Sequence, residues 1–256
     1  MKLFISSISG VVLGFLAGLL GVGGGEFRLP VLLYVLKLPI LSAITGNLFV
    51  GLATVVFSFI ARVNLKMFNS EVLTLGLIMS PASILGAYLG AMLTDKIKTK
   101  VLKVAVVAFL IIVGVKFLFK PLLVLGTDKF YLPIWQKSVY ALAVGIVVGV
   151  ISGIFGVAGG EFRIPLLIYL FGLDVKLAGT TSLLVSIPTV AAGFIKHHKL
   201  NHFDSKHSLI FTIMALSSLV GGYFGARFAY EIDKHLLEKI LGVVLILASV
   251  RMVTKP

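Results

Sequence analysis

One stretch of the sequence decides the fold, and it occurs twice. Residues 14–36 read GFLAGLLGVGGGEFRLPVLLYVL, and residues 149–171 read GVISGIFGVAGGEFRIPLLIYLF. The copies align without a gap at a shift of 135 residues, and Val, Glu, Phe, Arg, Pro and Tyr recur with the glycines. At the same shift, SILGAYLGA at 83–91 meets SLVGGYFGA at 218–226. The chain is therefore an internal duplication.

The composition places both copies in a membrane. Of the 256 residues, 59% are hydrophobic and 13% are charged, and the mean hydropathy is +1.11. Because a helical span needs about 20 apolar residues, the length allows roughly seven to nine crossings and no separate soluble domain. Lys2 is the only charge before the first apolar run, which continues past any cleavage point. We therefore interpret residues 1–20 as mature structure rather than as a signal peptide.

Each copy contains three uninterrupted apolar runs that are long enough to span a membrane. They are residues 40–61, 73–93 and 101–119 in the first copy, and 175–195, 209–230 and 236–253 in the second. The predicted fold is an all-α integral membrane protein of two homologous repeats, residues 1–118 and 137–256. A polar linker, residues 119–136, joins them.

The opening segment of each repeat differs from these runs. In the first repeat, residues 3–20 are followed by four glycines and then by a short apolar piece, residues 29–36, which reaches only about half of the membrane. We predict a re-entrant helical hairpin with the glycines at its tip. Pro30 and Pro165 are expected in the first turn of the returning half-helix, where proline is tolerated.

Such a hairpin adds no net crossing, so each repeat crosses three times and the second repeat is expected to be inverted relative to the first. Parallel repeats are the alternative if the short piece joins the next helix as one kinked span. Inversion with the N-terminus inside places several basic segments in the cytoplasm, as the positive-inside rule favours. These are Lys96, Lys98, Lys100 and Lys103, the loop 196–206, and Arg251 with Lys255. We predict a multi-pass protein of the inner (plasma) membrane with both termini cytoplasmic.

Four charged residues lie inside otherwise apolar stretches: Glu26, Arg28, Glu161 and Arg163. Each costs roughly 2.5 to 3.5 kcal/mol in a membrane even on a lenient insertion scale, so their placement needs a cause. Glycine tips expose backbone N–H groups and half-helix N-termini direct partial positive charge at one point, which suits an anion. The alternative is that two ion pairs, Glu26 with Arg163 and Arg28 with Glu161, only lock the tips together.

The second helix of each repeat is polar where it is expected to face the tips, and its hydroxyl and amide donors would complete the shell of an oxyanion. The alternative is packing by small residues and bonding to the i−4 carbonyl. The polar residues are Thr45, Asn47 and Thr54, with Thr180, Thr181, Ser182, Ser186 and Thr189. The pairs Gly86/Gly90 and Gly221/Gly225 fit G-x-x-x-G helix packing and are assigned no chemistry.

The doubled GVGGGEFRLP (21–30) and GVAGGEFRIP (156–165) resemble the glycine-rich signature of the TauE/SafE family of sulfite and sulfonate exporters, over nearly the whole chain. The resemblance implies a small permease for sulfur-containing anions, with substrate contacts on the motif glycines and the helices that follow. The chain departs from the family pattern, because Glu and Arg follow the glycines where many members carry an apolar residue. The candidate substrate-binding residues are Gly23, Gly24, Gly25, Glu26, Arg28, Asn47, Ala158, Gly159, Gly160, Glu161, Arg163 and Ser182.

Other classes of function are disfavoured. The net charge is +13, but the basic residues lie singly at the ends of apolar segments rather than together in a patch that could bind nucleic acid. His197, His198 and His202 suggest a membrane metalloenzyme, but they follow an apolar run and have no partner cluster, so a solvated basic loop is preferred. The chain has no cysteine and no P-loop, and we predict no cofactor and no bound metal. A structural or assembly protein, in which the Glu/Arg motifs are only a lock, is the remaining alternative.

Charge counting adds a prediction about coupling. Glu26, Arg28, Glu161 and Arg163 sum to zero before any substrate arrives, so a bound anion leaves the centre negative. A proton on Glu26 or Glu161 would restore neutrality, and an uncompensated charge is expensive in a low-dielectric environment. We therefore expect coupled movement of anion and proton by alternating access. The rival is an uncoupled anion passage driven by the membrane potential.

Overall fold

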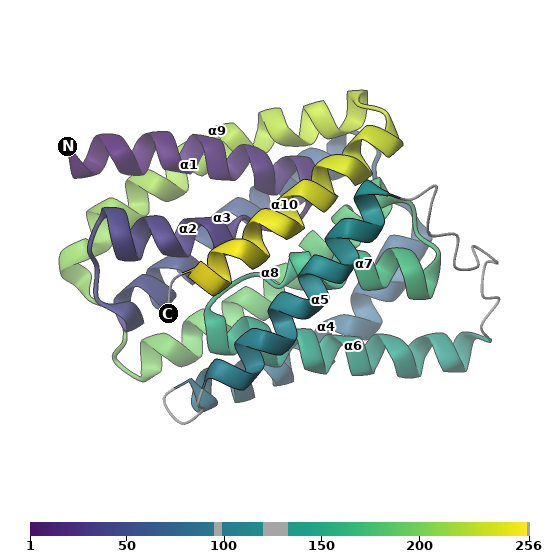
Figure 1. The fold of residues 1–256 in the computed structure, drawn as a ribbon, viewed down its shortest axis with the longest axis horizontal. Helices are drawn as coiled ribbons and strands as arrows, with labels where there is room; N and C mark the ends of the chain where they lie inside the picture. Colours follow the sequence, from purple (N-terminus) through teal and green to yellow (C-terminus); the bar gives the residue numbers. More distant parts are fainter. Residues whose placement is uncertain (95–98, 120–132, 255–256) are drawn as a thin grey trace.

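The computed structural model describes residues 1–94, 99–119 and 133–254, and within them it contains helices and no strand (Figure 1). In the first repeat the elements are α1 (Lys2–Leu20), α2 (Gly25–Pro30), the π-helix η1 (Val31–Val35), α3 (Ile40–Asn64), α4 (Ser70–Leu93) and α5 (Thr99–Leu118). In the second repeat they are α6 (Ile134–Phe155), α7 (Gly160–Phe171), α8 (Val175–Lys199), the 3₁₀ turn η2 (Ser205–His207), α9 (Ser208–Glu231) and α10 (Lys234–Thr254).

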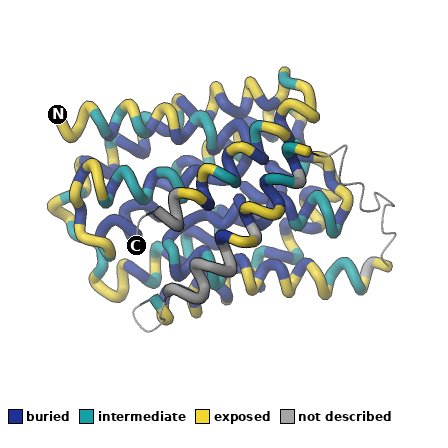
Figure 2. Tube along the Cα trace, viewed as in Figure 1, coloured by how far each residue is buried: buried dark blue, intermediate teal, exposed yellow. Residues whose placement is uncertain are grey.

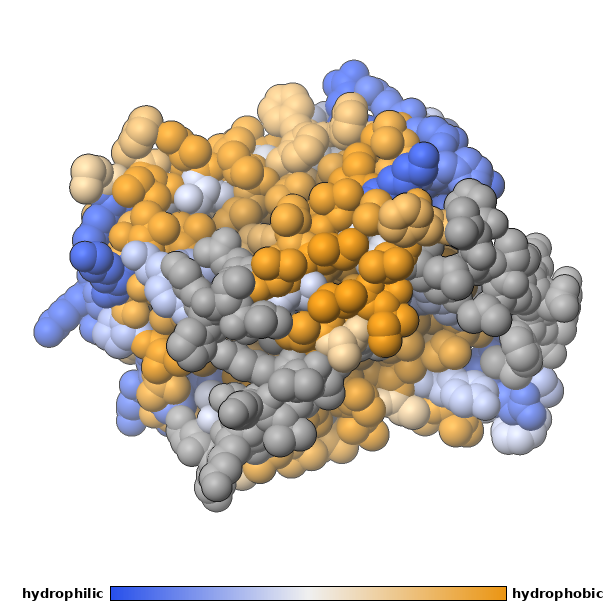
Figure 3. Space-filling model, viewed as in Figure 1, coloured by the Kyte–Doolittle hydropathy of each residue, from blue (hydrophilic) through white to orange (hydrophobic). Residues whose placement is uncertain are grey.

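Six helices among the described residues are long and apolar enough to cross a membrane. They are Lys2–Leu20, Ile40–Asn64, Ser70–Leu93, Trp135–Phe155, Val175–Lys199 and Ser205–Glu231. Four of them coincide with predicted spans, and the predicted spans 101–119 and 236–253 form α5 and α10, whose side chains are only partly described. Hydrophobic residues cover the middle of the face seen in Figure 3, and hydrophilic residues gather at its two ends. The chain is therefore an all-helical, multi-pass membrane protein.

The helix break predicted at each glycine stretch is present. α1 ends at Leu20 and is followed by Gly21, which has φ 83°, and α2 begins after Gly24, which has φ 68°. In the second repeat α6 ends at Phe155 and is followed by Gly156, with φ 65°, and α7 begins after Gly159, with φ 76°. Such left-handed backbone favours glycine. The outgoing arms differ from the expected re-entrant segments, because α1 and α6 are each long enough to span the membrane and only the returning arms are short.

The prolines lie deeper in the returning helices than predicted. Pro30 and Pro165 each occupy the sixth position of their helix rather than its first turn. Since proline has no N–H, the carbonyl four residues earlier, that of Glu26 or Glu161, loses its usual helical donor. In the first repeat the helix continues beyond Pro30 as the π-helix η1, whereas α7 stays α-helical through Pro165.

The two repeats exchange their first helices. α1 packs along α9 of the second repeat, and α6 packs along α4 of the first repeat (Figure 1). The predicted G-x-x-x-G contacts are confirmed at these two interfaces. A methyl group added to Gly90 on α4 would overlap the carbonyl oxygen of Val150 on α6, and one added to Gly225 on α9 would overlap that of Phe15 on α1.

The interior of the molecule is built around α3 and α8, which are the most buried of the candidate spans. Figure 2 shows the buried trace concentrated in the centre of the molecule and the exposed residues along the outer helices. Many of the side chains on the inner faces of α3 and α8 are polar, including Asn47, Thr54, Ser182, Ser186 and Thr189. A membrane interior disfavours buried polar groups without partners, so these side chains mark the place where a site is expected.

Candidate functional site

The tips of the two broken helices touch each other. A methyl group added to Gly160 would lie 2.5 Å from the Cα of Val22, and one added to Gly25 would lie 3.3 Å from the Cα of Val157. Gly23 faces Ala158 in the same way, with 2.5 Å between the two Cβ positions. Glycine at these places therefore permits a close approach of two backbones that are separated by more than 130 residues in the sequence.

Asn47 on α3 fastens both tips. Its amide nitrogen Nδ2 donates to the carbonyl oxygens of Gly25 at 3.0 Å and Gly156 at 2.7 Å. Its Oδ1 accepts a hydrogen bond of 3.3 Å from Nη1 of Arg28. One side chain of the first repeat thus holds a carbonyl from each copy of the motif.

Ser182 on α8 is the residue that corresponds to Asn47 in the second repeat, and it behaves differently. Its backbone carbonyl accepts a hydrogen bond of 3.1 Å from Nη1 of Arg163. Its hydroxyl is buried and has no hydrogen-bond partner among the described residues. The two halves of the site are therefore related in position and unequal in chemistry.

Arg28 is fully buried and is held by neutral groups. Besides Asn47, Nη2 donates to the carbonyl oxygen of Gly23 at 3.1 Å and to Oγ1 of Thr54 at 3.2 Å. Oγ1 of Thr54 in turn lies 2.7 Å from the hydroxyl of Ser218 on α9. The guanidinium is thereby oriented by the tip, by α3 and by a helix of the other repeat.

Arg163 repeats this arrangement in the second repeat. It is fully buried, and its Nη1 donates to Oγ of Ser186 at 2.8 Å while Nη2 donates to Oγ of Ser83 on α4 at 3.3 Å. The hydroxyl of Thr189 donates to the same Ser83 oxygen at 2.7 Å. Ser83 and Ser218, which complete these networks, were not predicted as site residues, although their recurrence at the 135-residue shift was a visible signal.

Glu161 is buried, Glu26 is half-buried with a buried carboxylate group, and neither makes the expected ion pair among the described residues. Among the described residues, no ion pair joins Glu26 or Glu161 to Arg28 or Arg163. Both carboxylate oxygens of Glu26 and Oε2 of Glu161 are buried without a hydrogen-bond partner, as are the Nε atoms of both arginines. The proposed lock of Glu26 with Arg163 and Arg28 with Glu161 is therefore absent from the described contacts.

Not every predicted site residue faces the junction of the tips. Gly24 and Gly159 end the breaks and pack against the preceding helices, because added methyl groups would meet the carbonyl oxygen of Leu13 at 2.8 Å and Cγ1 of Val148 at 2.7 Å. Thr45 donates back to the carbonyl of Leu41 on its own helix. Thr181 likewise donates to the carbonyl of Leu177, so Thr45 and Thr181 follow the alternative of i−4 bonding.

The histidine prediction needs a correction at one position. His197 was expected in a solvated basic loop, but its side chain is fully buried within α8. It contacts the carbonyl oxygen of Gly153 at 3.1 Å and Nδ1 of His202 at 3.0 Å. His198 is exposed, as predicted, and the described residues contain no group of three or more His, Cys, Asp or Glu suited to a metal ion.

Interrupted helices that meet inside a multi-pass membrane protein are characteristic of secondary transporters. The sequence matches the family described as Sulfite exporter TauE/SafE over residues 6–252, and the chain belongs to this family. The family is one of membrane transporters rather than of enzymes, and the chain is accordingly a membrane transporter.

Curated relatives align over most of their length. The chain is similar to "Probable membrane transporter protein YdhB" of Bacillus subtilis, at 26% identity over 90% of this chain and 91% of the relative. It is similar to "Probable membrane transporter protein YunE" of the same organism at 23% identity, covering 99% and 98%. A "Probable membrane transporter protein" of Xylella fastidiosa is 27% identical, covering 97% and 94%. No solved structure matches the chain.

Proposed function

We propose that this transporter moves a small sulfur-containing anion, such as sulfite or an organosulfonate, and holds it at the junction of the two tips. The observation that carries the proposal is the pair of fully buried arginines at the doubled motif, each with an Nε that has no hydrogen-bond partner among the described residues. A guanidinium presents several N–H donors in a fixed plane, which matches the oxygens of an oxyanion. The family description adds support for a sulfur oxyanion.

The chemical difference between the two halves of the site, around Asn47 and around Ser182, supports binding of the anion in the second repeat. The buried hydroxyl of Ser182, next to Arg163, has no partner within the described parts of the chain, whereas the amide nitrogen of Asn47 donates to a carbonyl of each tip. α7 also begins at this point and runs for 12 residues, so its first N–H groups add partial positive charge. Unpartnered donors buried together are costly unless a ligand satisfies them during the transport cycle. The remaining wall of the site would be formed by the other candidate residues, which are Gly23, Gly25, Glu26, Arg28, Gly160 and Glu161.

The proposal extends to topology and mechanism. We infer two inverted repeats, residues 1–118 and 137–256, that alternate access around the tips in the inner membrane, with both termini cytoplasmic. In support, α1 begins at the left-hand end of Figure 1 and α6 begins at the right-hand end. The exchange of α1 and α6 between repeats also means that movement of one repeat displaces a helix packed in the other.

A ligand panel tests the transport function against the alternative of a structural or assembly protein. The purified protein in detergent is unfolded thermally with sulfite, thiosulfate, sulfate, propanesulfonate and acetate. A ligand at about 100 times its dissociation constant stabilises the folded state by about 2.7 kcal/mol. We expect stabilisation by one or more sulfur anions and none by acetate. If no anion shifts the unfolding temperature, the proposed function is wrong and the structural or assembly protein is favoured.

Proton coupling is a separate part of the proposal. The four charged groups of the motifs sum to zero, and a proton carried with the anion would keep the buried centre neutral. Proteoliposomes with an imposed pH gradient test it, using Glu26→Gln and Glu161→Gln. Coupling requires that at least one variant loses gradient-driven accumulation while anion exchange persists. Unchanged accumulation in both variants would leave the glutamates without a proton-carrying role and would favour passage driven by the membrane potential.

A further inference from the structure

An open groove lies where α4 and α6 begin, and we call it the α4–α6 groove. Its volume is about 190 Å³. The lining residues are Ser70, Glu71, Thr74, Leu75 and Ile78 of α4, and Lys137 of α6. All of them belong to the first three turns of their helices. The groove is therefore beside the ends of two spanning helices and is separate from the junction of the tips.

The packing of α4 on α6 places an acid and a base at the same level of the groove. The two helices run parallel, because methyl groups added to successive glycines of α6 would meet successive backbone carbonyls of α4. These pairs are Gly145 with Met79, Gly149 with Ser83 and Gly153 with Ala87. Continued about two turns toward the helix starts, the same register sets Lys137 beside Glu71. Both residues line the groove, as this register requires.

Glu71 and Lys137 share the groove without bonding to each other. No described ion pair joins them, and no described hydrogen bond uses either side chain. Glu71 is exposed and Lys137 is half-buried. Opposite charges that face one groove from a distance longer than an ion pair leave room between them for a group that carries both charges.

The groove lies at the level expected for lipid headgroups. Hydrophilic residues gather at the two ends of the molecule (Figure 3), and α6 begins at one of these ends. Trp135, the only tryptophan of the chain, is two residues before Lys137 and is 64% exposed. Tryptophan is enriched at membrane–water interfaces. Farther along α4 the groove becomes apolar, at the buried Leu75 and the half-buried Ile78. Charges at the end of the helices and an apolar floor beyond them match a headgroup followed by acyl chains.

Two helix N-termini make the Lys137 side of the groove favourable for a phosphate. α4 has 24 residues and α6 has 22, and the N–H groups in the first turn of a helix have no partner within it. The side chain of Asn69 accepts from one of them, that of Val72, at 2.9 Å. The partial positive charge of the helix starts adds to that of the lysine, and Glu71 remains as the partner for a cation.

The equivalent place in the second repeat has a different charge pattern. α1 packs on α9 in the same register as α6 packs on α4. The residues that correspond to Lys137 and Glu71 at the 135-residue shift are Lys2 and Lys206, and both are exposed. One end of the molecule therefore presents an acid with a base, and the equivalent place presents two cations.

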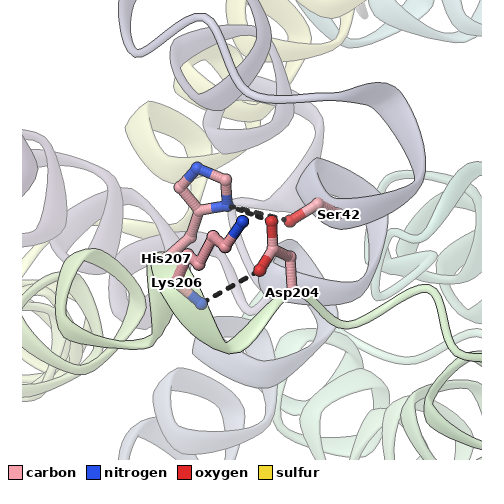
Figure 4. A network of polar contacts seen from close by, with 4 residues as sticks. All are labelled: Ser42, Asp204, Lys206 and His207. Carbon is pink, nitrogen blue, oxygen red and sulfur yellow. Dashed lines mark hydrogen bonds and ion pairs between the residues drawn. The ribbon is translucent and has the colours of Figure 1, made fainter.

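The acid nearest to Lys206 in the sequence is already bonded. Figure 4 shows His207 against Asp204 and Ser42, with Nδ1 3.4 Å from Oδ2 of Asp204 and 3.5 Å from Oγ of Ser42. The backbone N–H of Lys206 also donates to Asp204, at 3.0 Å. Asp204 therefore serves its own connection, whereas the carboxylate of Glu71 has no described partner.

We propose that the α4–α6 groove binds phosphatidylethanolamine, with the lipid phosphate at Lys137 and the lipid ammonium at Glu71. An ethanolamine ammonium has three N–H donors, and a charge-assisted hydrogen bond to a carboxylate is among the stronger ones. The trimethylammonium of phosphatidylcholine has no N–H donor, and phosphatidylglycerol has no cation for Glu71. The inference is independent of which anion is transported and of the orientation of the chain in the membrane.

Native mass spectrometry of the full-length protein in detergent tests the proposal. The delipidated protein is offered phosphatidylethanolamine and phosphatidylcholine in equal amounts and with identical acyl chains. Because a solvent-accessible charge pair contributes less than about 1 kcal/mol, we expect a preference of about three- to fivefold for phosphatidylethanolamine. Equal binding of the two lipids would overturn the proposal.

Two matched variants assign the preference to the groove. Glu71→Gln should abolish the preference, and Lys137→Gln should weaken binding of both lipids, because both contain a phosphate. Neither side chain has a described partner, so both variants should keep the unfolding temperature of the parent protein. Lys206→Gln, at the position equivalent to Glu71, is the control and should retain the preference. A preference that survives Glu71→Gln would contradict the assignment of the ammonium.

Two further measurements identify the source of the ligand. Glu71→Lys copies the two-cation pattern of the second repeat and should transfer the preference from phosphatidylethanolamine to phosphatidylglycerol. Glycerophosphoethanolamine, which has the same headgroup without acyl chains, should not displace the lipid at an equal concentration. Displacement by this soluble compound would assign the groove to a free zwitterion and overturn the lipid site. These outcomes do not depend on transport, so the ligand panel tests the proposed anion site separately.

Discussion

At the scale of single residues, Arg28 and Arg163 are the unusual feature of this protein. Both guanidinium groups are fully buried, and their described hydrogen bonds go to backbone carbonyls, hydroxyls and one amide rather than to carboxylates. A buried charge held by neutral dipoles retains its attraction for an anion, whereas a charge already paired with a carboxylate does not. The geometry is therefore that of oriented cations whose described hydrogen bonds all go to neutral groups.

Replacing either arginine by lysine is expected to reduce anion binding and to lower stability. Arg163→Lys keeps the charge but cannot reach Ser83, Ser186 and the carbonyl of Ser182 together, which should cost about 1 to 3 kcal/mol for each polar group left unpaired. Thermal unfolding with and without the best anion of the panel measures both effects. Arg227→Lys on α9, whose partner is the exposed Glu231, is the control and should change neither. Normal anion binding by Arg28→Lys and Arg163→Lys would remove these side chains from the ligand shell.

Asn47 and Ser182 should respond differently to substitution although they occupy equivalent positions. Asn47→Ser removes the donor to the carbonyls of Gly25 and Gly156, and leaving a buried carbonyl unpaired costs about 1 to 3 kcal/mol. Ser182→Ala removes a hydroxyl that has no described partner and should leave stability in the absence of ligand unchanged. If Ser182→Ala weakens anion binding without lowering the unfolding temperature of the ligand-free protein, the hydroxyl contacts the ligand. The opposite pattern, with Asn47→Ser neutral, would contradict its role in joining the tips.

At the scale of elements, glycine performs two distinct tasks. In the breaks it allows left-handed backbone and the contact between tips, as at Gly21 and Gly160. Within α4 and α9 it allows close helix packing, because the space beside these glycines is filled by the backbone of α6 or α1. Apolar side chains give little drive for association between helices in lipid, so close backbone packing contributes much of the attraction.

The packing glycines should therefore be intolerant of even a methyl group. Gly90→Ala would place a Cβ against the carbonyl oxygen of Val150, and overpacking of this kind costs about 1 to 3 kcal/mol. Gly193→Ala on α8 is the matched control, because its Cβ would have its nearest neighbour at an ordinary 3.6 Å and alanine favours the helix by about 0.5 to 1 kcal/mol. Thermal unfolding of the two variants measures the difference. Equal stability would show that α4 and α6 can separate at little cost.

At the scale of the whole molecule, the exchange of first helices binds the two repeats into one unit. α1 lies against α9 and α6 against α4, so neither repeat encloses its own opening helix. Each arginine network also crosses between repeats, through Ser218 for Thr54 and through Ser83 for Thr189. A movement of one repeat relative to the other would therefore disturb both arginines at once, which is what the proposed alternating access requires.

The inferred inversion can be tested by the sidedness of two equivalent serines. Ser70, at the start of α4, and Ser205, before α9, are both exposed and lie at the same place in their repeats. In the cysteine-free chain, Ser70→Cys should react with a membrane-impermeant maleimide from outside the cell, and Ser205→Cys only after the membrane is opened. Labelling of both serine positions from one side would establish parallel repeats instead.

The sequence by itself determined the membrane class, the duplication, the helix breaks and the Glu/Arg motifs, because composition, self-alignment and glycine content act locally along the chain. It also pointed to Asn47 and Ser182, since their helices are polar within apolar surroundings. It did not determine which helices pair, which groups hold the arginines, or that His197 is buried. Those features depend on contacts between residues far apart in the sequence, such as Arg62 with Lys176 and Ser83 with Arg163. Only tertiary packing brings such partners within hydrogen-bonding distance, so burial and pairing of a polar side chain were decided by the folded structure.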